Sequence, residues 1–256
     1  SAASDVYKRQ ILNQGDRIMI DKMVGKTEVA LYGLAYSIGM LVQLFISGMN
    51  SALTPWMYSK IKKGDIRSMR KVLQLLSIVV VGIAVALMLI SPELVLIFGS
   101  PKYHEAVYVI PPVAASVFFI FIYNILSMPQ FYYEKTQFLM AASMAAAGAN
   151  VVLNFIFIHL FGYIAAGYTT LACYMLYSVG HYIVSKRILV NEGIQENLMN
   201  PGFLLACSVF LIGASIICNL IFPYRILRYA ILLASAGLVF WKKELLLKTM
   251  ADIRKK

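Results

Sequence analysis

Two asparagines, Asn150 and Asn154, stand four residues apart in "ANVVLNFIFIHLF", a stretch that is otherwise almost entirely apolar. Side chains at this spacing lie on the same face of a helix, so the two amides can act together. An amide left unpaired in apolar surroundings would cost about 2 to 7 kcal/mol. We therefore expect both amides to face protein or water, where they either link helices or contact a polar, uncharged ligand.

Two further segments also carry polar residues at helical spacing, which we call polar stripes: "LVQLFISGMNSALTPWMYSK" and "GYIAAGYTTLACYMLYSVGHY". Steps of three and four residues place the polar groups of each segment on one helical face. A single polar residue in such a stripe more often bridges helices than binds a ligand, but three parallel stripes leave both interpretations open. The candidates for a polar pathway are Gln43, Asn50, Asn150, Asn154, Tyr174 and His181.

Charged groups beside the apolar segments are few. Asp16 and Arg17 are the exception, and they are predicted either to contact a charged ligand or to cap a helix end. The segment "PKYHEAV" lacks the HExxH spacing of a metalloprotease, and the three cysteines form no CxxC pair. The sequence thus predicts no catalytic residue, no metal site and no cofactor, and the protein is not expected to be an enzyme.

The elements that carry these stripes are predicted from the composition. Of the 256 residues, 60% are hydrophobic and only 14% charged, whereas about a quarter of the residues of soluble domains are charged. No Asp, Glu, Lys or Arg occurs in residues 29–59, 72–92, 106–133, 136–185 or 197–224. A membrane-spanning helix needs about 20 such residues, and the period-two alternation of a barrel is absent.

We therefore predict an all-α fold, a polytopic integral membrane bundle of about seven complete transmembrane helices. The predicted spans are residues 31–54, 72–91, 106–128, 137–159, 163–185, 203–222 and 226–241. Residues 1–10 resemble a non-native remnant, 11–190 form the main bundle, 191–202 a cytoplasmic connection, and 203–256 a terminal hairpin with a basic tail.

The net charge of +11 is distributed unevenly along the chain. Most basic residues follow the first, third, fifth and seventh predicted spans, while the intervening loops carry few. Lys and Arg concentrate on the cytoplasmic side of membrane proteins, so the C-terminus is predicted to be cytoplasmic. The basicity is expected to serve orientation and contact with anionic membrane lipid, and we expect no binding of nucleic acid.

Three longer segments are similar to one family of membrane proteins. "LNQGDRIMIDKMVGKTEVALYGLAYSIGM", "YHEAVYVIPPVAASVFFIFIYNIL" and "FYYEKTQFLMAASMAAAGANVVLNFIFIHLFGYIAAGYTTL" resemble the C-terminal half of polysaccharide flippases, the O-antigen and capsule exporters of the multidrug/oligosaccharidyl-lipid/polysaccharide superfamily. The pair Asn150 and Asn154 corresponds to the family's two asparagines before a glycine-containing turn, here Gly162 to Gly167.

The resemblance implies one of two related bundles, with the N-terminal half absent from this chain. Together the bundles would flip an undecaprenyl-pyrophosphate-linked oligosaccharide across the bacterial cytoplasmic membrane by alternating access, for export of surface polysaccharide. The implied partners are the lipid-linked oligosaccharide, membrane lipid and the N-terminal half, and the mechanism leaves room for a coupling ion.

Several alternatives stay open. A multidrug cation antiporter of the same superfamily would favour a carboxylate buried within a span, and none lies in the complete spans. A lipid II flippase would be expected to have a more cationic cavity. From another class, a membrane-embedded glycan polymerase or acyltransferase would need a large outer loop or a membrane histidine paired with an acid.

Overall fold

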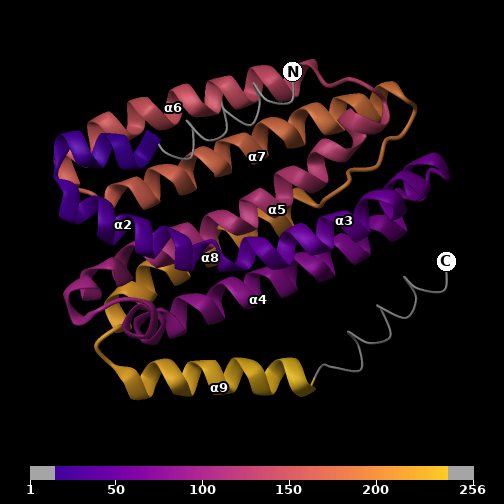
Figure 1. Ribbon diagram of the computed structural model, residues 1–256. Coiled ribbons are helices and arrows are strands. Elements are labelled where there is room, and N and C mark those ends of the chain that lie inside the picture. The colour runs from indigo at the N-terminus through magenta and orange to yellow at the C-terminus, as the bar shows by residue number, and fades with distance from the viewer. Residues whose placement is uncertain (1–14, 242–256) are drawn as a thin grey trace.

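The computed structural model describes residues 15–241, and this part of the chain forms an all-helical bundle (Figure 1). After helical residues 15–23, the elements are α2 (Lys26–Gly39), α3 (Leu41–Lys62), α4 (Ile66–Phe98), the 3-10 helix η1 (Pro101–Val109), α5 (Ile110–Tyr132), α6 (Gln137–Phe161), α7 (Ala165–Asn191), α8 (Pro201–Ile221) and α9 (Arg225–Trp241). The predicted remnant at residues 1–10 and the basic tail beyond residue 241 lie outside the described residues.

The predicted class, a polytopic helical membrane protein, is confirmed. Within the described chain, five segments are long and apolar enough to cross a membrane: 26–62, 66–98, 101–132, 137–161 and 201–221. Five of the predicted spans overlap these five segments, and the other two overlap α7 and α9. Tyrosines and threonines make α7 less apolar, although its 27 residues are long enough to span.

The first predicted span is divided in the structure. We expected one helix over residues 31–54, but α2 ends at Gly39 and α3 begins at Leu41. A Cβ built on Gly39 would lie 2.6 Å from Cγ1 of Val113 on α5. The missing side chain therefore lets the break between α2 and α3 press against the start of α5.

The helix α5 forms the centre of the bundle, with α3, α4, α7 and α8 packed around it. Every residue from Ile110 to Ile122 is buried, as expected for a helix that is apolar on all sides. By contrast, α6 and α8 expose many large apolar side chains. In a chain of this composition such surfaces are those that face lipid or another part of the assembly.

Small residues, which can let helices pack closely, cluster at the start of α7 and in α6. Close packing is observed in the first turn of α7, because a Cβ on Gly167 would lie 3.0 Å from Cγ of Pro112. In "AASMAAAGA" of α6 it is not, since most of these residues are exposed and Gly148 has nothing within 4 Å of its Cβ position. Within the described chain, Gly167 thus joins Gly39 as a glycine that allows close helix contact, whereas the small residues of α6 do not.

Candidate functional site

A buried hydrogen-bond network joins Asn150 and Asn154 to a carboxylate that is distant in the sequence. Asn154 is 0% exposed, and its Nδ2 donates to Oδ1 of Asp16 at 2.5 Å and to Oδ1 of Asn150 at 3.1 Å. The hydroxyl of Thr169 donates to Oδ1 of Asn154. Both donor hydrogens and the acceptor of the Asn154 amide are therefore used inside the protein.

Asp16 lies at the meeting point of four helical segments. It belongs to helical residues 15–23, drawn in indigo beside α6 in Figure 1, and it is 6% exposed. Tyr32 of α2 donates its hydroxyl to Oδ2 of Asp16 at 2.8 Å, and Thr170 of α7 does so at 3.1 Å. Together with Asn154 of α6, three side-chain donors surround one carboxylate.

This arrangement differs from the helix cap considered from the sequence, because the donors to Asp16 are side chains of other helices. Arg17 points elsewhere, with its Nε 3.8 Å from the Cβ position of Gly33 on α2. Burial disfavours a charged carboxylate, while three donors favour it.

We call this network the Asp16 cluster; it consists of Asp16, Tyr32, Asn150, Asn154, Thr169 and Thr170. Its oxygen atoms determine which ions it suits. They comprise one carboxylate, amide oxygens and hydroxyls. Across residues 15–241 there is no group of three or more His, Cys, Asp and Glu side chains placed to hold a metal ion. A single negative charge with neutral oxygen donors suits a proton or a monovalent alkali cation better than a divalent metal, which favours several carboxylates.

A second group of polar and aromatic residues lies farther along α7. The rings of Tyr123 and Tyr174 stack with centroids 6.2 Å apart, and Tyr177 meets Tyr123 edge-on at 4.8 Å. The ring of His181 lies 4.4 Å from that of Tyr177, and its Nδ1 is 2.7 Å from Nε2 of Gln130. An amide nitrogen can only donate, so Nδ1 accepts and the proton of His181 resides on Nε2.

The helix α5 opens to the surface at this level. Between residues 110 and 127, only Tyr123 and Asn124 are not buried. At about 100° per residue, Asn124 lies between Tyr123, which contacts α7, and Tyr132, whose ring lies 5.5 Å from that of Tyr58 on α3. An arc of α5 is therefore left uncovered between α3 and α7.

We call the surface around this arc the polar face. It consists of partly exposed residues of three helices: Asn50, Thr54 and Tyr58 of α3, Tyr123 and Asn124 of α5, and Tyr174 and Tyr177 of α7. These side chains are amides, hydroxyls and phenols, without a carboxylate or a basic group among them. Such groups bind neutral polar molecules by hydrogen bonds and offer flat aromatic surfaces for stacking.

The structure thus divides the predicted site residues among different places. Asn150, Asn154 and Asp16 come together in the Asp16 cluster, while Tyr174 and Asn50 contribute to the polar face and His181 lies buried behind it. Gln43 lies nearer the start of α3, and its buried Oε1 has no hydrogen-bond partner among the described residues.

Two residues of the polar face, Tyr123 and Asn124, were missed because they lie in the long apolar run of α5. No periodic polar stripe marks them in the sequence. A single tyrosine and asparagine side by side in "FIFIYNIL" was the available signal.

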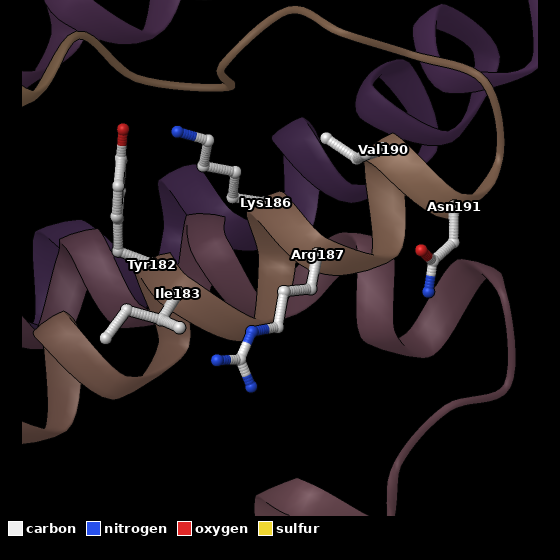
Figure 2. A pocket seen from close by; sticks show the side chains of 6 residues that line it. All are labelled: Tyr182, Ile183, Lys186, Arg187, Val190 and Asn191. Carbon is white, nitrogen blue, oxygen red and sulfur yellow. The ribbon is translucent and has the colours of Figure 1, made fainter.

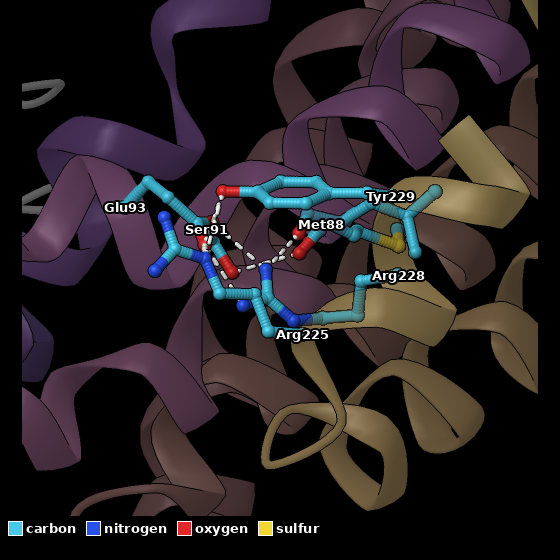
Figure 3. Close-up of polar contacts among 7 residues, drawn as sticks. Met88, Ser91, Glu93, Arg225, Arg228 and Tyr229 are labelled. Carbon is cyan, nitrogen blue, oxygen red and sulfur yellow. Dashed lines mark hydrogen bonds and ion pairs between the residues drawn. The ribbon is translucent and has the colours of Figure 1, made fainter. Parts of the chain in front are cut away.

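A buried ion pair between α4 and α9 was also missed (Figure 3). Arg228 is 3% exposed, and its two terminal nitrogens each lie 2.8 Å from an oxygen of Glu93. Tyr229 donates its hydroxyl to Glu93 at 2.9 Å. The predicted span 226–241 includes Arg228, and the structure places this residue in the first turn of α9.

A proline explains why Arg228 docks here. Pro92 has no N–H, so the carbonyl of Met88 one turn earlier loses its helical partner. The hydroxyl of Ser91 donates to this carbonyl at 2.8 Å, and Nη1 of Arg228 donates to the next carbonyl, of Leu89, at 2.6 Å (Figure 3). The guanidinium of Arg228 on α9 thus binds the turn of α4 that precedes Pro92.

Comparison with known proteins places the chain in a family. The family model named MatE matches residues 10–156, more than half of the chain. An uncharacterized membrane protein of Haemophilus influenzae is 30% identical over 135 residues, which are 49% of this chain and 32% of that protein. The match therefore spans about a third of that relative's length, and no solved structure matches significantly. With its helical membrane bundle and the family match over residues 10–156, the chain belongs to the MatE family of membrane transporters.

Proposed function

We propose that the chain is the C-terminal bundle of an ion-coupled flippase for lipid-linked oligosaccharide. The cargo would be an undecaprenyl-pyrophosphate-linked glycan, moved from the inner to the outer leaflet of the bacterial cytoplasmic membrane by alternating access. The N-terminal bundle would supply the other wall of the pathway. The match to only 32% of the relative from Haemophilus influenzae supports a larger whole.

The observation that carries the choice of cargo is the composition of the polar face. Amides, hydroxyls and tyrosine rings suit the hydroxyl groups and flat faces of sugars. The surface would be costly to expose to lipid, where unpaired polar groups find no partners. A pathway for a hydrated glycan accounts for polar groups on three adjacent helices at once.

A multidrug cation antiporter is the second candidate, and the buried carboxylate of Asp16 favours it. An organic cation, however, needs a negative group that it can reach. Asp16 is 6% exposed and accepts hydrogen bonds from three side chains of its own chain. We assign Asp16 to the coupling ion, and the uncharged polar face to the cargo.

The absence of basic groups also distinguishes the polar face from the cavity expected of a lipid II flippase. None of its residues is Lys or Arg. In this proposal, the pyrophosphate is recognised by groups outside the polar face.

Complementation tests the proposal. The complete gene is introduced into a bacterium lacking its own O-antigen or capsule flippase, and surface glycan is measured by gel staining. We expect the glycan to return. In parallel, a strain lacking its drug exporters should gain no resistance to cationic dyes; resistance without glycan would instead establish the antiporter.

A double variant tests the polar face itself. Tyr123→Ala with Tyr177→Ala should reduce surface glycan at least about tenfold at equal abundance in the membrane. The matched control is Phe155→Ala with Leu160→Ala, which removes two large side chains from the exposed surface of α6. Full glycan in the tyrosine variant would remove this face from the pathway.

A further inference from the structure

The last turns of α7 border a hollow of 430 Å³ (Figure 2). Its lining consists of Tyr182, Ile183, Lys186, Arg187, Val190 and Asn191. Figure 2 shows Lys186 and Arg187 pointing to opposite sides of the helix, so the two cations flank the hollow. Apolar groups and positive charges are thus combined in one place.

Both cations lack an anionic partner within the described chain. Lys186 and Arg187 are exposed, and the ion pairs of residues 15–241 include neither. Nearby, Lys135 pairs with Glu192 at 2.8 Å, which shows that this end of the bundle does pair its lysines where a carboxylate is available. An anion for Lys186 and Arg187 would have to come from outside residues 15–241.

Helix length places the two cations at the membrane surface. A hydrocarbon core of about 30 Å is crossed by about 20 residues at about 1.5 Å per residue. Counted from Ala165, where α7 begins, the apolar core ends near residue 185. Lys186 and Arg187 follow directly, at the level of the lipid headgroups.

An exposed apolar stripe leads to the hollow from the membrane side. Leu176 is 63% exposed, Val179 56% and Ile183 45%. Their spacing of three and four residues puts them on one face of α7, and one further step of four reaches Arg187. A hydrocarbon chain along this stripe would bring its headgroup to the guanidinium.

We propose that the hollow binds one anionic phospholipid of the bilayer. Its phosphate would contact Arg187, since guanidinium groups form charge-assisted hydrogen bonds with phosphate oxygens, and Lys186 on the other side of the helix would add positive charge nearby. One acyl chain lies along Ile183, Val179 and Leu176. The site is separate from the polar face and does not depend on the identity of the cargo.

The experiment uses the full-length protein, purified in detergent and titrated with phosphatidylglycerol or phosphatidylcholine, with bound lipid counted by native mass spectrometry. We expect at least about tenfold tighter binding of phosphatidylglycerol. Lys186→Gln with Arg187→Gln should remove this preference. Lys62→Gln with Lys63→Gln, which removes two exposed charges at the end of α3, should leave it within about twofold.

Two results would overturn the proposal. Equal loss in both double variants would mean that general positive charge, and not this hollow, attracts the lipid. Binding of undecaprenyl pyrophosphate at the hollow without binding of phosphatidylglycerol would assign the same phosphate chemistry to a cargo molecule. Failure of the complementation test would leave the lipid measurement unaffected, so the two proposals fail independently.

Discussion

We propose that the carboxylate of Asp16 is the group through which a coupling ion would act on the bundle. It contacts α2, α6 and α7 at once through Tyr32, Asn154 and Thr170. A change in its charge therefore alters the contacts among three helices.

Replacing Asp16 by Asn removes the charge while keeping the size and an acceptor oxygen. We expect transport by the reconstituted full-length protein to fall at least about tenfold and to lose its dependence on the proton or sodium gradient. The melting temperature should fall modestly, because Tyr32 and Thr170 can still donate to the amide oxygen but the new amide nitrogen faces the donor Nδ2 of Asn154. Transport is measured in proteoliposomes with each gradient imposed separately.

Asp21→Asn is the matched control, since Asp21 lies in the same helical segment, residues 15–23, but is exposed. It should leave transport unchanged. If Asp16→Asn retained full, gradient-dependent transport, the coupling ion would have to bind elsewhere.

Part of this site could be predicted from single residues and their spacing. The four-residue step of Asn150 and Asn154 predicts that the two amides share a helical face, and in the structure a hydrogen bond joins them. The partner, Asp16, lies 138 positions from Asn154 in the chain, and no local pattern links the two. Long-range contacts of this kind depend on how helices pack, which periodicity does not specify.

At the level of elements, Gly39 sets the contact of the α2–α3 break with α5. Gly39→Ala should destabilise the protein by about 1 to 3 kcal/mol, because the added methyl overlaps Val113. Unfolding in mixed micelles measures the change. Adding Val113→Ala should recover part of the loss.

Gly48→Ala serves as the comparison within α3, as nothing lies within 4 Å of its Cβ position. Alanine favours a helix by about 1 kcal/mol over glycine, so this variant should be slightly stabilised. A loss of similar size at both glycines would point to a general sensitivity of α2 and α3 to substitution and not to the contact with Val113.

The ion pair of Arg228 and Glu93 attaches α9 to the bundle. Arg228→Met should destabilise the full-length protein by about 3 kcal/mol, the lower end of the range for breaking a buried pair, since Tyr229 still donates to Glu93. The double variant with Glu93→Leu should recover most of this loss. Thermal unfolding in detergent measures both.

Arg225→Met provides the control, because Arg225 is 72% exposed and 3.9 Å from Glu93. Its effect should stay below about 1 kcal/mol. Equal effects of the two arginine variants would show that burial of Arg228 adds nothing to the attachment of α9.

The helical elements themselves were largely predictable, since the absence of charge over some 20 residues is a strong physical requirement of a lipid environment. The positions of the helix ends were harder to predict. The helix α4 extends from Ile66 to Phe98 and includes charged residues at both ends, because helices continue into the headgroup layer where charges are solvated. The break near Met40 depends on contact with Val113, which the local sequence does not reveal.

For the whole molecule, the uneven distribution of Lys and Arg predicts its orientation in the membrane. The connection after α3 is flanked by Lys60, Lys62, Lys63 and Arg67, whereas that after α4 carries Lys102 alone. The excess of basic residues is retained on the cytoplasmic side. We therefore expect the α3–α4 connection to be cytoplasmic and the α4–η1 connection to be external.

Cysteine labelling in intact cells tests this orientation. In a full-length protein whose native cysteines are replaced by serine, Lys102→Cys should react with a membrane-impermeant maleimide, and Lys63→Cys should react only after the cells are permeabilised. Both positions are exposed, so a lack of reaction reports the membrane side and not burial. The inverted pattern would place Lys186 and Arg187 in the outer leaflet, and the phospholipid at the hollow would then have to be supplied from that side.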